Sequence, residues 1–421
     1  MSQQGVEPHI IRKYEIQSQL GKGAYGVVWR AIDRRTKKVV ALKKIFDAFQ
    51  NSTDAQRTFR EVMFLQALKH DNIITLQNVL RAENDKDLYL VFEFMETDLH
   101  AVIRARILED IHKQYIIFQL LKTLKYLHSA EVLHRDMKPS NLLLNSDCLM
   151  KVADFGLARS ILTLEREQVS KPVLTDYIAT RWYRAPEILL GSTKYTKGID
   201  MWSVGCILGE LINEKPIFPG GSTMNQLERI VAVVGRPTPE DIAATSSRFA
   251  ETMLDNLGRI VPKTFAELCP KASPEAIDLM SKLLQFNPNT RFTAEEALEH
   301  PYVAAFHRPQ DEPSAPGPIT ISLPDDTRYT VSEYRERLYA EIVAKKRSER
   351  PAGTTAPRTT GSAYGTRPAG ATSSTTSTAP KADPTKRTSV TEKRSSLSSG
   401  YGSQSRVGGT RPASGATSTT K

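Results

Sequence analysis

The stretch at residues 134–141, with the sequence that follows it, constrains this chain more than any other feature. It reads His-Arg-Asp-Met-Lys-Pro-Ser-Asn and leads into an apolar run, a polar turn and a second β-type run that ends in Asp-Phe-Gly at residues 154–156. Two short β-type runs joined by a tight turn predict a β-hairpin. This hairpin would bring Asp136, Asn141 and Asp154 to one spot.

These three side chains would form a site rich in oxygen atoms. Carboxylate and amide oxygens suit Mg²⁺, which takes a few protein ligands together with phosphate oxygens and water. A carboxylate beside a metal and a phosphate can also orient a hydroxyl nucleophile. A polar loop without such a role is the alternative, because the triplet His-Arg-Asp also occurs by chance.

The length and the cysteine pattern limit the class of protein. A chain of 421 residues exceeds one ordinary hydrophobic core, so we expect two lobes or two domains with extensions. The cysteines Cys148, Cys206 and Cys269 lack metal-type spacing and are expected to be reduced thiols. The apolar run 201–212 contains Glu210 and is too short to span a membrane, so no membrane partner is expected. We expect a cytoplasmic location, with the nucleus, or the cytoskeleton and basal body, as alternatives.

The positive charge is concentrated at the C-terminal end. Residues 351–421 hold ten Lys and Arg residues against two acidic ones, which accounts for +8 of the net charge of +10. The same stretch is rich in Ser, Thr, Gly, Ala and Pro, and its segment 365–372 nearly recurs at 409–417. Such a composition buries too little apolar surface to offset the entropy lost on ordering. We predict a disordered basic tail that either contacts acidic cytoskeletal surfaces or nucleic acid through charge, or only solubilises the chain.

The order of periodic segments indicates the fold class. Residues 11–40 alternate turns with β-branched runs, as in a β-meander. Thr53 and Gln56 have the spacing of a capping box and predict the start of a helix. Helices dominate later in the chain, and residues 199–211 are apolar nearly all round, which predicts a helix buried at the centre of a lobe. Helical periodicity returns at residues 332–350. Strands followed by helices predict a two-lobed α+β protein.

A glycine-rich loop lies between the first two predicted strands. Gly21, Gly23 and Gly26 would let the backbone approach phosphates, although the same spacing opens dinucleotide-binding folds. In those folds a helix follows the glycines, whereas here β-prone residues follow, which favours a loop that covers phosphates between two strands. Lys43 ends an apolar strand and is either a surface lysine or a phosphate clamp. Glu61, on the next predicted helix, offers its counter-charge.

Six motifs occur in the order that is typical of protein kinases. They are the glycine-rich loop, Val-Ala-Leu-Lys ending at Lys43, His-Arg-Asp, Asn141, Asp-Phe-Gly, and Ala-Pro-Glu ending at Glu187. The chain resembles eukaryotic protein kinases over roughly residues 14–305, which implies the bilobal α+β protein kinase fold. The implied domains are an N-terminal extension (1–13), the kinase domain (14–305, with a β-rich N-lobe at 14–95 and a helical C-lobe at 96–305), an extension that wraps the kinase (306–350) and the disordered tail (351–421).

The resemblance implies the roles of the central residues and the cofactors ATP and Mg²⁺. Asp136 would accept the proton of the substrate hydroxyl, and Lys138 would steady the γ-phosphate. Asn141 and Asp154 would hold Mg²⁺.

The resemblance also implies which residues bind the nucleotide. Lys43, paired with Glu61, would contact the α- and β-phosphates, and Phe92 would be the gatekeeper beside the hinge that binds adenine. The implied ATP-binding residues are Leu20, Gly21, Lys22, Gly23, Ala24, Tyr25, Gly26, Val27, Val28, Lys43, Phe92, Glu93, Met95 and Asp98.

Residues 175–187 resemble the activation segment of MAP kinases, in which Thr-x-Tyr is phosphorylated. Phosphates on Thr175 and Tyr177 would each add roughly −1.5 to −2 charge at neutral pH and would need cationic partners. Glu187 would pair with Arg291 to brace this segment. The other residues implied are Arg60, Arg135 and Arg159 for the phosphothreonine, Arg181 and Arg184 for the phosphotyrosine, and Asp200 as a cap on the catalytic-loop backbone.

Within this group the chain is most similar to the atypical MAP kinase 15 branch (extracellular-signal-regulated kinase 7/8), because of the run at residues 329–339 and the long basic tail. That branch is associated with autophosphorylation of both Thr-x-Tyr residues. MAP kinases also dock basic peptides on an acidic Asp-x-x-Asp-Glu sequence. Here Arg308 replaces the first Asp, while Asp311 and Glu312 remain, so we expect conventional docking to be weakened.

We therefore predict a monomeric serine/threonine kinase that acts on protein substrates at Ser/Thr-Pro sites. The competing hypothesis is a kinase-fold scaffold that acts through its basic tail on cytoskeletal or nucleic-acid partners. The intact residues Lys43, Asp136, Asn141 and Asp154 disfavour it, because a pseudokinase typically lacks at least one of them. The Pro-x-x-Pro sequence at 313–316 would suit an SH3-type module, although chance is favoured in a proline-rich linker.

Overall fold

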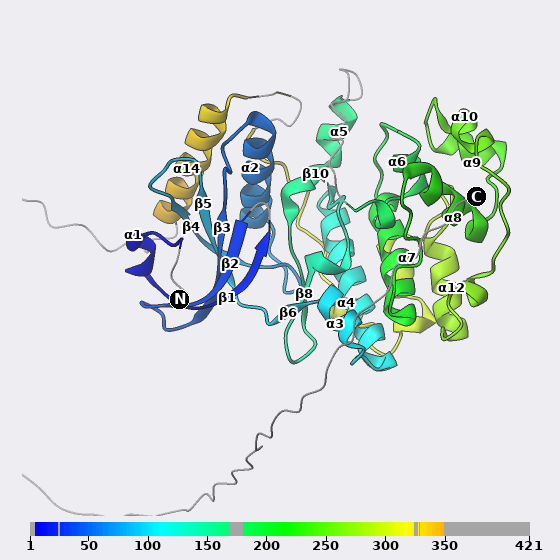
Figure 1. Cartoon of the computed structure of the whole chain (residues 1–421), viewed down its shortest axis with the longest axis horizontal. Helices are drawn as coiled ribbons and strands as arrows, with labels where there is room; N and C mark the ends of the chain where they lie inside the picture. The colour runs from blue at the N-terminus through cyan, green and yellow to red at the C-terminus, as the bar shows by residue number, and fades with distance from the viewer. Residues whose placement is uncertain (1–4, 24–25, 168–179, 324–326, 328, 349–421) are drawn as a thin grey trace, which may run out of the picture. The chain divides into compact units, whose positions relative to one another are not determined.

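Five antiparallel strands form the sheet of the N-lobe (Figure 1). Along β3 the side chains of Val40 and Leu42 are fully buried, while their neighbours are partly exposed. This alternation is what a half-buried strand requires, and the predicted meander is confirmed. In the sheet order β1-β2-β3-β5-β4, the strands are β1 (Tyr14–Gly23), β2 (Gly26–Asp33), β3 (Val39–Ile45), β5 (Leu88–Glu93) and β4 (Leu76–Arg81).

The structure is a computed structural model that describes residues 5–23, 26–167, 180–323, 327 and 329–348. The described residues belong to one compact unit, residues 1–354. The predictions for Ala24, Tyr25, Thr175, Tyr177 and the tail at 351–421 lie outside the described residues. Within the described ranges, no helix combines the length and the apolar character needed to cross a membrane.

Helix α2 (Ser52–Ala67) follows β3 and carries Glu61. Its N-cap is Asn51, whose side-chain oxygen accepts hydrogen bonds from the amides of Thr53 and Asp54 at 3.0 and 2.9 Å. The capping box predicted from Thr53 and Gln56 is therefore wrong. The run Asn-Ser-Thr offers three successive N-cap side chains, and spacing alone does not select among them.

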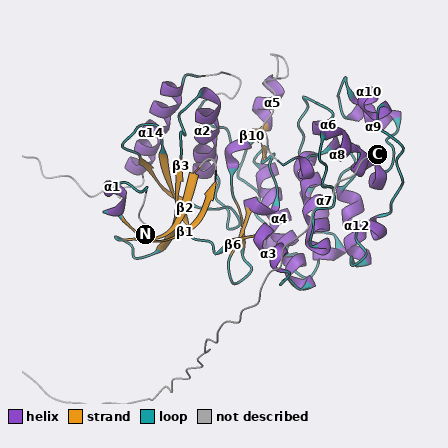
Figure 2. Ribbon diagram, viewed as in Figure 1, coloured by secondary structure: helices purple, strands orange, loops and turns teal. Residues whose placement is uncertain are grey.

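Helices make up most of the C-lobe (Figure 2). Every residue of α7 from Ile199 to Ile212 is buried, so the predicted central helix is confirmed. The helices are α3 (Leu99–Ala105), α4 (Asp110–Ser129), α5 (Ile161–Glu167), α6 (Pro186–Leu189), α7 (Gly198–Asn213), α8 (Thr223–Val234), α9 (Pro239–Ala244), α10 (Ala250–Asp255), α11 (Phe265–Leu268), α12 (Pro274–Leu283) and α13 (Ala294–Leu298).

Short strands position the loop at residues 134–141. Strands β8 (Leu142–Leu144) and β9 (Met150–Val152) pair antiparallel, and β6 (Thr97–Asp98) pairs with β8. The predicted hairpin is confirmed. On the other side of the loop, β7 (Val132–Leu133) pairs with β10 (Arg159–Ser160). Both ends of the loop are therefore fixed by strand pairing.

The helix α14 (Val331–Ser348) confirms the periodicity seen at residues 332–350 and packs against α2. The Tyr334 ring lies 5.7 Å from the ring of Phe59, and the side chain of Leu338 is fully buried. Earlier in this extension, the amide of Ala315 donates to Ser129 Oγ at 2.8 Å. The segment after the kinase domain therefore contacts both lobes.

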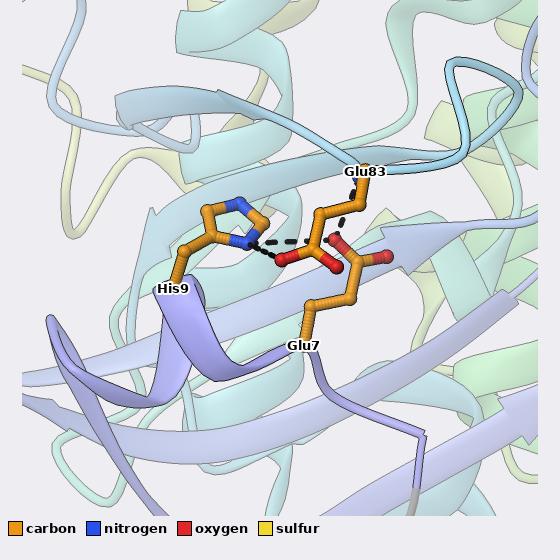
Figure 3. Close-up of side chains that lie close together, drawn as sticks. All are labelled: Glu7, His9 and Glu83. Carbon is orange, nitrogen blue, oxygen red and sulfur yellow. Dashed lines mark hydrogen bonds and ion pairs between the residues drawn. The ribbon is translucent and has the colours of Figure 1, made fainter.

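A cluster of side chains holds the N-terminal helix α1 (Pro8–Ile11) against the turn after β4 (Figure 3). His9 Nδ1 lies 3.1 Å from Glu83 Oε1 and 3.7 Å from Glu7 Oε2. Glu7 also accepts the amide of Glu83 at 2.9 Å and faces the ammonium of Lys44 at 3.4 Å. Because Lys44 already balances Glu7, we interpret the cluster as an anchor for α1.

Candidate active site

The loop at 134–141 is held by a buried carboxylate from the first turn of α7. Asp200 accepts hydrogen bonds from the amides of His134 and Arg135 at 3.0 and 2.9 Å, and His128 Nε2 lies 3.1 Å away. Burial raises the pKa of Asp200, but the hydrogen bond and charge of His128 and the nearby His134 lower it by more. The carboxylate therefore stays ionised and fixes the loop backbone, in which Arg135 adopts a left-handed conformation (φ 69°).

Asp136 lies at the centre of a hydrogen-bonded group within this loop. Lys138 Nζ donates to Asp136 Oδ2 at 2.6 Å. The side-chain nitrogen of Asn141 donates to the Asp136 carbonyl at 2.8 Å and to Oδ2 at 3.2 Å. Because Asn141 uses its nitrogen here, its side-chain oxygen is the atom that could ligate a cation. The Asn141 carbonyl accepts the amide of Ala153 at 2.9 Å, which links this group to the residue before Asp154.

Asp154 begins the Asp-Phe-Gly turn with a left-handed backbone (φ 61°). Arg57 of α2 donates through Nη2 to its Oδ2 and Oδ1 atoms at 3.0 and 3.3 Å. Burial raises the pKa of Asp154, but the charges of Arg57 and Lys43 lower it by more, so the pKa lies below its usual value. Sequence reasoning missed Arg57. The available signal was its spacing, one turn before Glu61 on the same helix face.

Lys43 and Glu61 join the sheet to α2. Lys43 Nζ lies 2.8 Å from Glu61 Oε1, and the carboxylate is buried while the lysine is one-third exposed. Burial lowers the pKa of Lys43, but the charges of Glu61 and Asp154 raise it by more. Lys43 therefore remains a cation, as a phosphate-binding lysine must.

A cavity of about 400 Å³ lies beside these charges. Its walls include Gly23, Gly26 and Val28 of the glycine-rich strands, together with Lys43 and Asp154. A Cβ atom at Gly26 would collide with the carbonyl oxygen of Lys44, so only glycine fits there. A polyanion held with a divalent cation fits this lining, because the lining supplies both a lysine, Lys43, and a carboxylate, Asp154. The other predicted glycine-loop residues with described positions, namely Leu20, Gly21, Lys22 and Val27, lie on β1 and β2.

The predicted adenine-side residues lie at and after the end of β5. Phe92 and Met95 are buried. The Glu93 carboxylate forms an ion pair with Lys151 at 3.1 Å, and the Asp98 side chain caps the N-terminus of α3. Both carboxylates thus have structural partners, and the main chain of this segment is the part suited to hydrogen-bonding a base.

The predicted phosphate-binding arginines come from α2 (Arg60), the loop at 134–141 (Arg135), β10 (Arg159) and residues 181–184. Arg135 Nη1 donates to the Leu157 carbonyl at 3.3 Å, and Arg135 Nε is buried without a hydrogen-bond partner among the described residues. Arg60 and Arg159 are buried, Arg184 is half-buried, and Arg181 Nη1 donates to the Gly221 carbonyl at 3.2 Å.

Glu187 and Arg291 form a buried bidentate ion pair. Both Nη–Oε distances are 2.7 Å, and the exposed fractions of the two side chains are 2% and 0%. Arg291 also donates to the carbonyls of Gln285, Gly198 and Phe286 at 2.8, 3.0 and 3.1 Å. This pair ties the Ala-Pro-Glu sequence to the start of α7 and to the segment after α12.

A second buried contact, which sequence reasoning missed, holds the end of the activation segment. The Tyr183 hydroxyl donates to Glu210 Oε2 of α7 at 2.6 Å, and Ser203 Oγ donates to the Tyr183 carbonyl at 2.9 Å. Burial raises the pKa of Glu210 more than the Tyr183 hydrogen bond lowers it. A glutamate within the apolar run at residues 204–212 was the available signal.

Residues 14–303 match the family model of the protein kinase domain, and the chain belongs to the protein kinase family. It is 65% identical over 351 residues to Extracellular signal-regulated kinase 2 of Dictyostelium discoideum, an alignment that covers 83% of this chain and 95% of that relative. It is 58% identical to Mitogen-activated protein kinase 15 of Xenopus laevis (82% and 59% covered) and 52% identical to that of Caenorhabditis elegans (82% and 74% covered).

The chain is therefore a serine/threonine protein kinase of the MAP kinase class, related to the MAP kinase 15 branch. The predicted family and the bilobal α+β fold are confirmed. Protein kinases use ATP, typically with Mg²⁺. The chain spans only 59% of the Xenopus relative, so it matches part of that protein.

Proposed function

We propose that this protein transfers the γ-phosphoryl group of ATP to Ser or Thr hydroxyls of protein substrates, preferably where proline follows. The observation that carries the proposal is the group formed by Asp136, Lys138 and Asn141, in which the Asp136 carboxylate accepts at 2.6 Å from a lysine beside a potential cation ligand. The cationic Lys43 and the ionised Asp154 line the adjacent cavity. Phosphoryl transfer needs these parts and little covalent chemistry from the protein.

Magnesium-bound ATP supplies the phosphoryl group, and Asn141 and Asp154 are the residues that would hold the ion. Lys43 binds the α- and β-phosphates and is kept in place by Glu61 at 2.8 Å. Asp136 orients the substrate hydroxyl and accepts its proton, while Lys138 offsets the charge that develops on the transferred group. Positioning and preorganised charge supply most of the catalysis.

We further propose that the kinase activates itself by phosphorylating Thr175 and Tyr177. The segment that follows these sites is tied to the residues before α8, since Arg181 and Trp182 donate to the carbonyls of Gly221 and Gly220, both at 3.2 Å. Because these two hydrogen bonds fix residues 181–182, they also support the separate proposal that this part of the chain accepts the proline of Ser/Thr-Pro sequences.

Full-length protein, expressed without other kinases and stripped of phosphate, is expected to label Thr175 and Tyr177 when given Mg²⁺-ATP. The Asp136→Ala variant is expected to acquire no label, because it lacks the proposed base. Peptide mass spectrometry measures both sites over time. Equal labelling of the two proteins would exclude self-activation. Failure to phosphorylate any Ser/Thr-Pro peptide when both sites carry phosphate would exclude the proposed activity.

The acidic docking sequence of MAP kinases is altered in structure as well as in sequence. Glu312 is buried, and its carboxylate contacts His307 Nδ1 at 2.8 Å, the amide of Arg308 at 3.0 Å and Lys125 Nζ at 3.4 Å. The remaining acidic side chain of this sequence, Asp311, and the replacing Arg308 are both exposed. Little negative charge is therefore displayed at this site.

Arg308→Asp is expected to tighten the binding of basic, apolar-anchored peptides about three- to ten-fold. It removes a repulsion and adds an attraction, each worth roughly 0.2–1 kcal/mol at a surface. Fluorescence polarisation at low and high salt measures the effect, which should shrink as salt rises. The exposed Arg35→Asp is the matched charge change far along the chain. An equal gain in both variants would show that net charge, and not this site, governs binding.

A further inference from the structure

Arg57 contacts the proposed metal ligand of this site directly. Its Nη2 atom lies 3.0 Å from Asp154 Oδ2 and 3.3 Å from Oδ1, so one guanidinium nitrogen faces both carboxylate oxygens. The arginine stem passes close to Gly156, where an added Cβ would lie 2.6 Å from Arg57 Nε and 2.7 Å from Cγ. The glycine of the Asp-Phe-Gly turn thus leaves the space that Arg57 uses.

The contact couples the turn to α2. Arg57 and Glu61 are four residues apart and therefore lie on the same helix face. Glu61 binds Lys43 at 2.8 Å and Arg57 binds Asp154 at 3.0 Å, and all four line the same cavity. One helix therefore supplies the partner of the lysine and the partner of the aspartate.

A guanidinium and a divalent cation compete for these oxygens. Mg²⁺ demands oxygen ligands at about 2.0–2.1 Å in near-octahedral geometry and repels a neighbouring positive charge. The Arg57 and Asp154 side chains are 23% and 26% exposed, so screening by water is only partial. A metal ion on Asp154 must therefore displace or weaken the arginine contact.

We propose that Arg57 is a placeholder cation for Asp154, which holds the Asp-Phe-Gly turn against α2 and is displaced when Mg²⁺ binds with nucleotide. This inference rests on the proposed role of Asp154 as a Mg²⁺ ligand. Because Mg²⁺ must displace Arg57, the enzyme requires a higher Mg²⁺ concentration than it would without this arginine. The displacement also releases α2 from the Asp-Phe-Gly turn as the nucleotide site fills.

The test measures metal-dependent nucleotide binding without turnover. Full-length wild type, Arg57→Gln and Arg57→Lys are each mixed with a fluorescent ADP analogue, and Mg²⁺ is titrated. Arg57→Gln keeps a polar, hydrogen-bonding side chain, although a shorter one, and removes the charge, so its half-saturating Mg²⁺ concentration is expected to fall about five-fold or more. For Arg57→Lys, whose ammonium is a compact point charge, the half-saturating Mg²⁺ concentration is expected to fall by about two-fold. Binding in EDTA should change little, as should every parameter of Arg104→Gln, an exposed control.

Thermal unfolding separates a placeholder from an ordinary structural arginine. Nucleotide-free Arg57→Gln is expected to unfold at a lower temperature than wild type, because Asp154 loses its partner. With saturating Mg²⁺-ADP the difference should largely disappear, since the ion then replaces the arginine. If the glutamine variant does not fold, the same comparison is made with Arg57→Lys.

Two results would overturn the placeholder role: an unchanged or higher Mg²⁺ requirement in both Arg57 variants, or an equal loss of stability with and without Mg²⁺-ADP. The Asp154→Asn variant tests the underlying assignment separately. If it retains the wild-type Mg²⁺ dependence, Asp154 is not a metal ligand and the proposed metal site fails, together with the inference that rests on it.

Discussion

The Asp136→Asn variant is expected to fold and bind nucleotide like wild type while losing about 10²- to 10⁴-fold in the rate of phosphoryl transfer. Asparagine has nearly the same shape, and its oxygen can still accept the hydrogen bond that Lys138 Nζ makes at 2.6 Å. It cannot accept the proton of a substrate hydroxyl. The change therefore removes the proposed base and leaves its surroundings in place.

The measurement must separate catalysis from activation, because a variant without a base cannot phosphorylate its own Thr175 and Tyr177. Immobilised wild-type kinase is used to phosphorylate the variant in trans, and mass spectrometry verifies both sites. Single-turnover kinetics with a Ser/Thr-Pro peptide then give the chemical rate. Asp147→Asn, an exposed change in the β8–β9 turn, is the matched control. A rate within ten-fold of wild type would rule out Asp136 as the base.

The parts of the site that sequence could predict are those encoded locally. Asp136 and Asn141 are five residues apart, and the β8–β9 hairpin follows from two apolar runs around a polar turn. The central helix was predictable for a similar reason, because an apolar surface on all sides requires burial wherever the helix lies.

The contacts that sequence could not predict join segments far apart in the chain. Arg57 and Asp154 are separated by 97 residues, and their pairing depends on how α2 packs against the Asp-Phe-Gly turn. Tyr183 and Glu210 meet only because the residues just before the Ala-Pro-Glu sequence pack against α7. No spacing rule connects such residues before the fold is known.

Local signals also failed where several residues competed or where burial decided. The start of α2 was misplaced because Asn51, Ser52 and Thr53 are all good N-caps. Glu312 counted as an available acidic residue in the sequence, yet its carboxylate is buried against Lys125 and His307. The sequence gives the charge of a residue, whereas the exposure of its side chain determines whether a partner can reach it.

Arg291→Met is expected to lower the free energy of unfolding by about 3–5 kcal/mol, because it leaves the Glu187 carboxylate buried without its counter-charge. The pair is almost completely removed from water, with side-chain exposures of 0% and 2%. Three carbonyl acceptors, those of Gln285, Gly198 and Phe286, lose their donor as well. Urea-induced unfolding followed by circular dichroism measures the loss.

The ion pair between Lys197 and Glu131 offers a matched comparison. Its Nζ–Oε1 distance of 2.8 Å is close to that of the buried pair, but its side chains are 43% and 30% exposed. Lys197→Met is therefore expected to cost less than about 1 kcal/mol. Equal losses of unfolding free energy in Lys197→Met and Arg291→Met would contradict this explanation, since burial would then not be what makes the Glu187–Arg291 pair costly to break.

A double variant separates the contribution of the Glu187–Arg291 pair to stability from its effect on catalysis. Glu187→Gln combined with Arg291→Met removes both charges, so it should recover part of the stability lost in Arg291→Met. It does not restore the bidentate link between the Ala-Pro-Glu sequence and the segment after α12. If that link positions the substrate-binding segment, the double variant will be more stable than Arg291→Met and yet have an equally reduced rate of substrate phosphorylation. Activity that recovers in step with stability would instead mean that the pair acts on the fold alone.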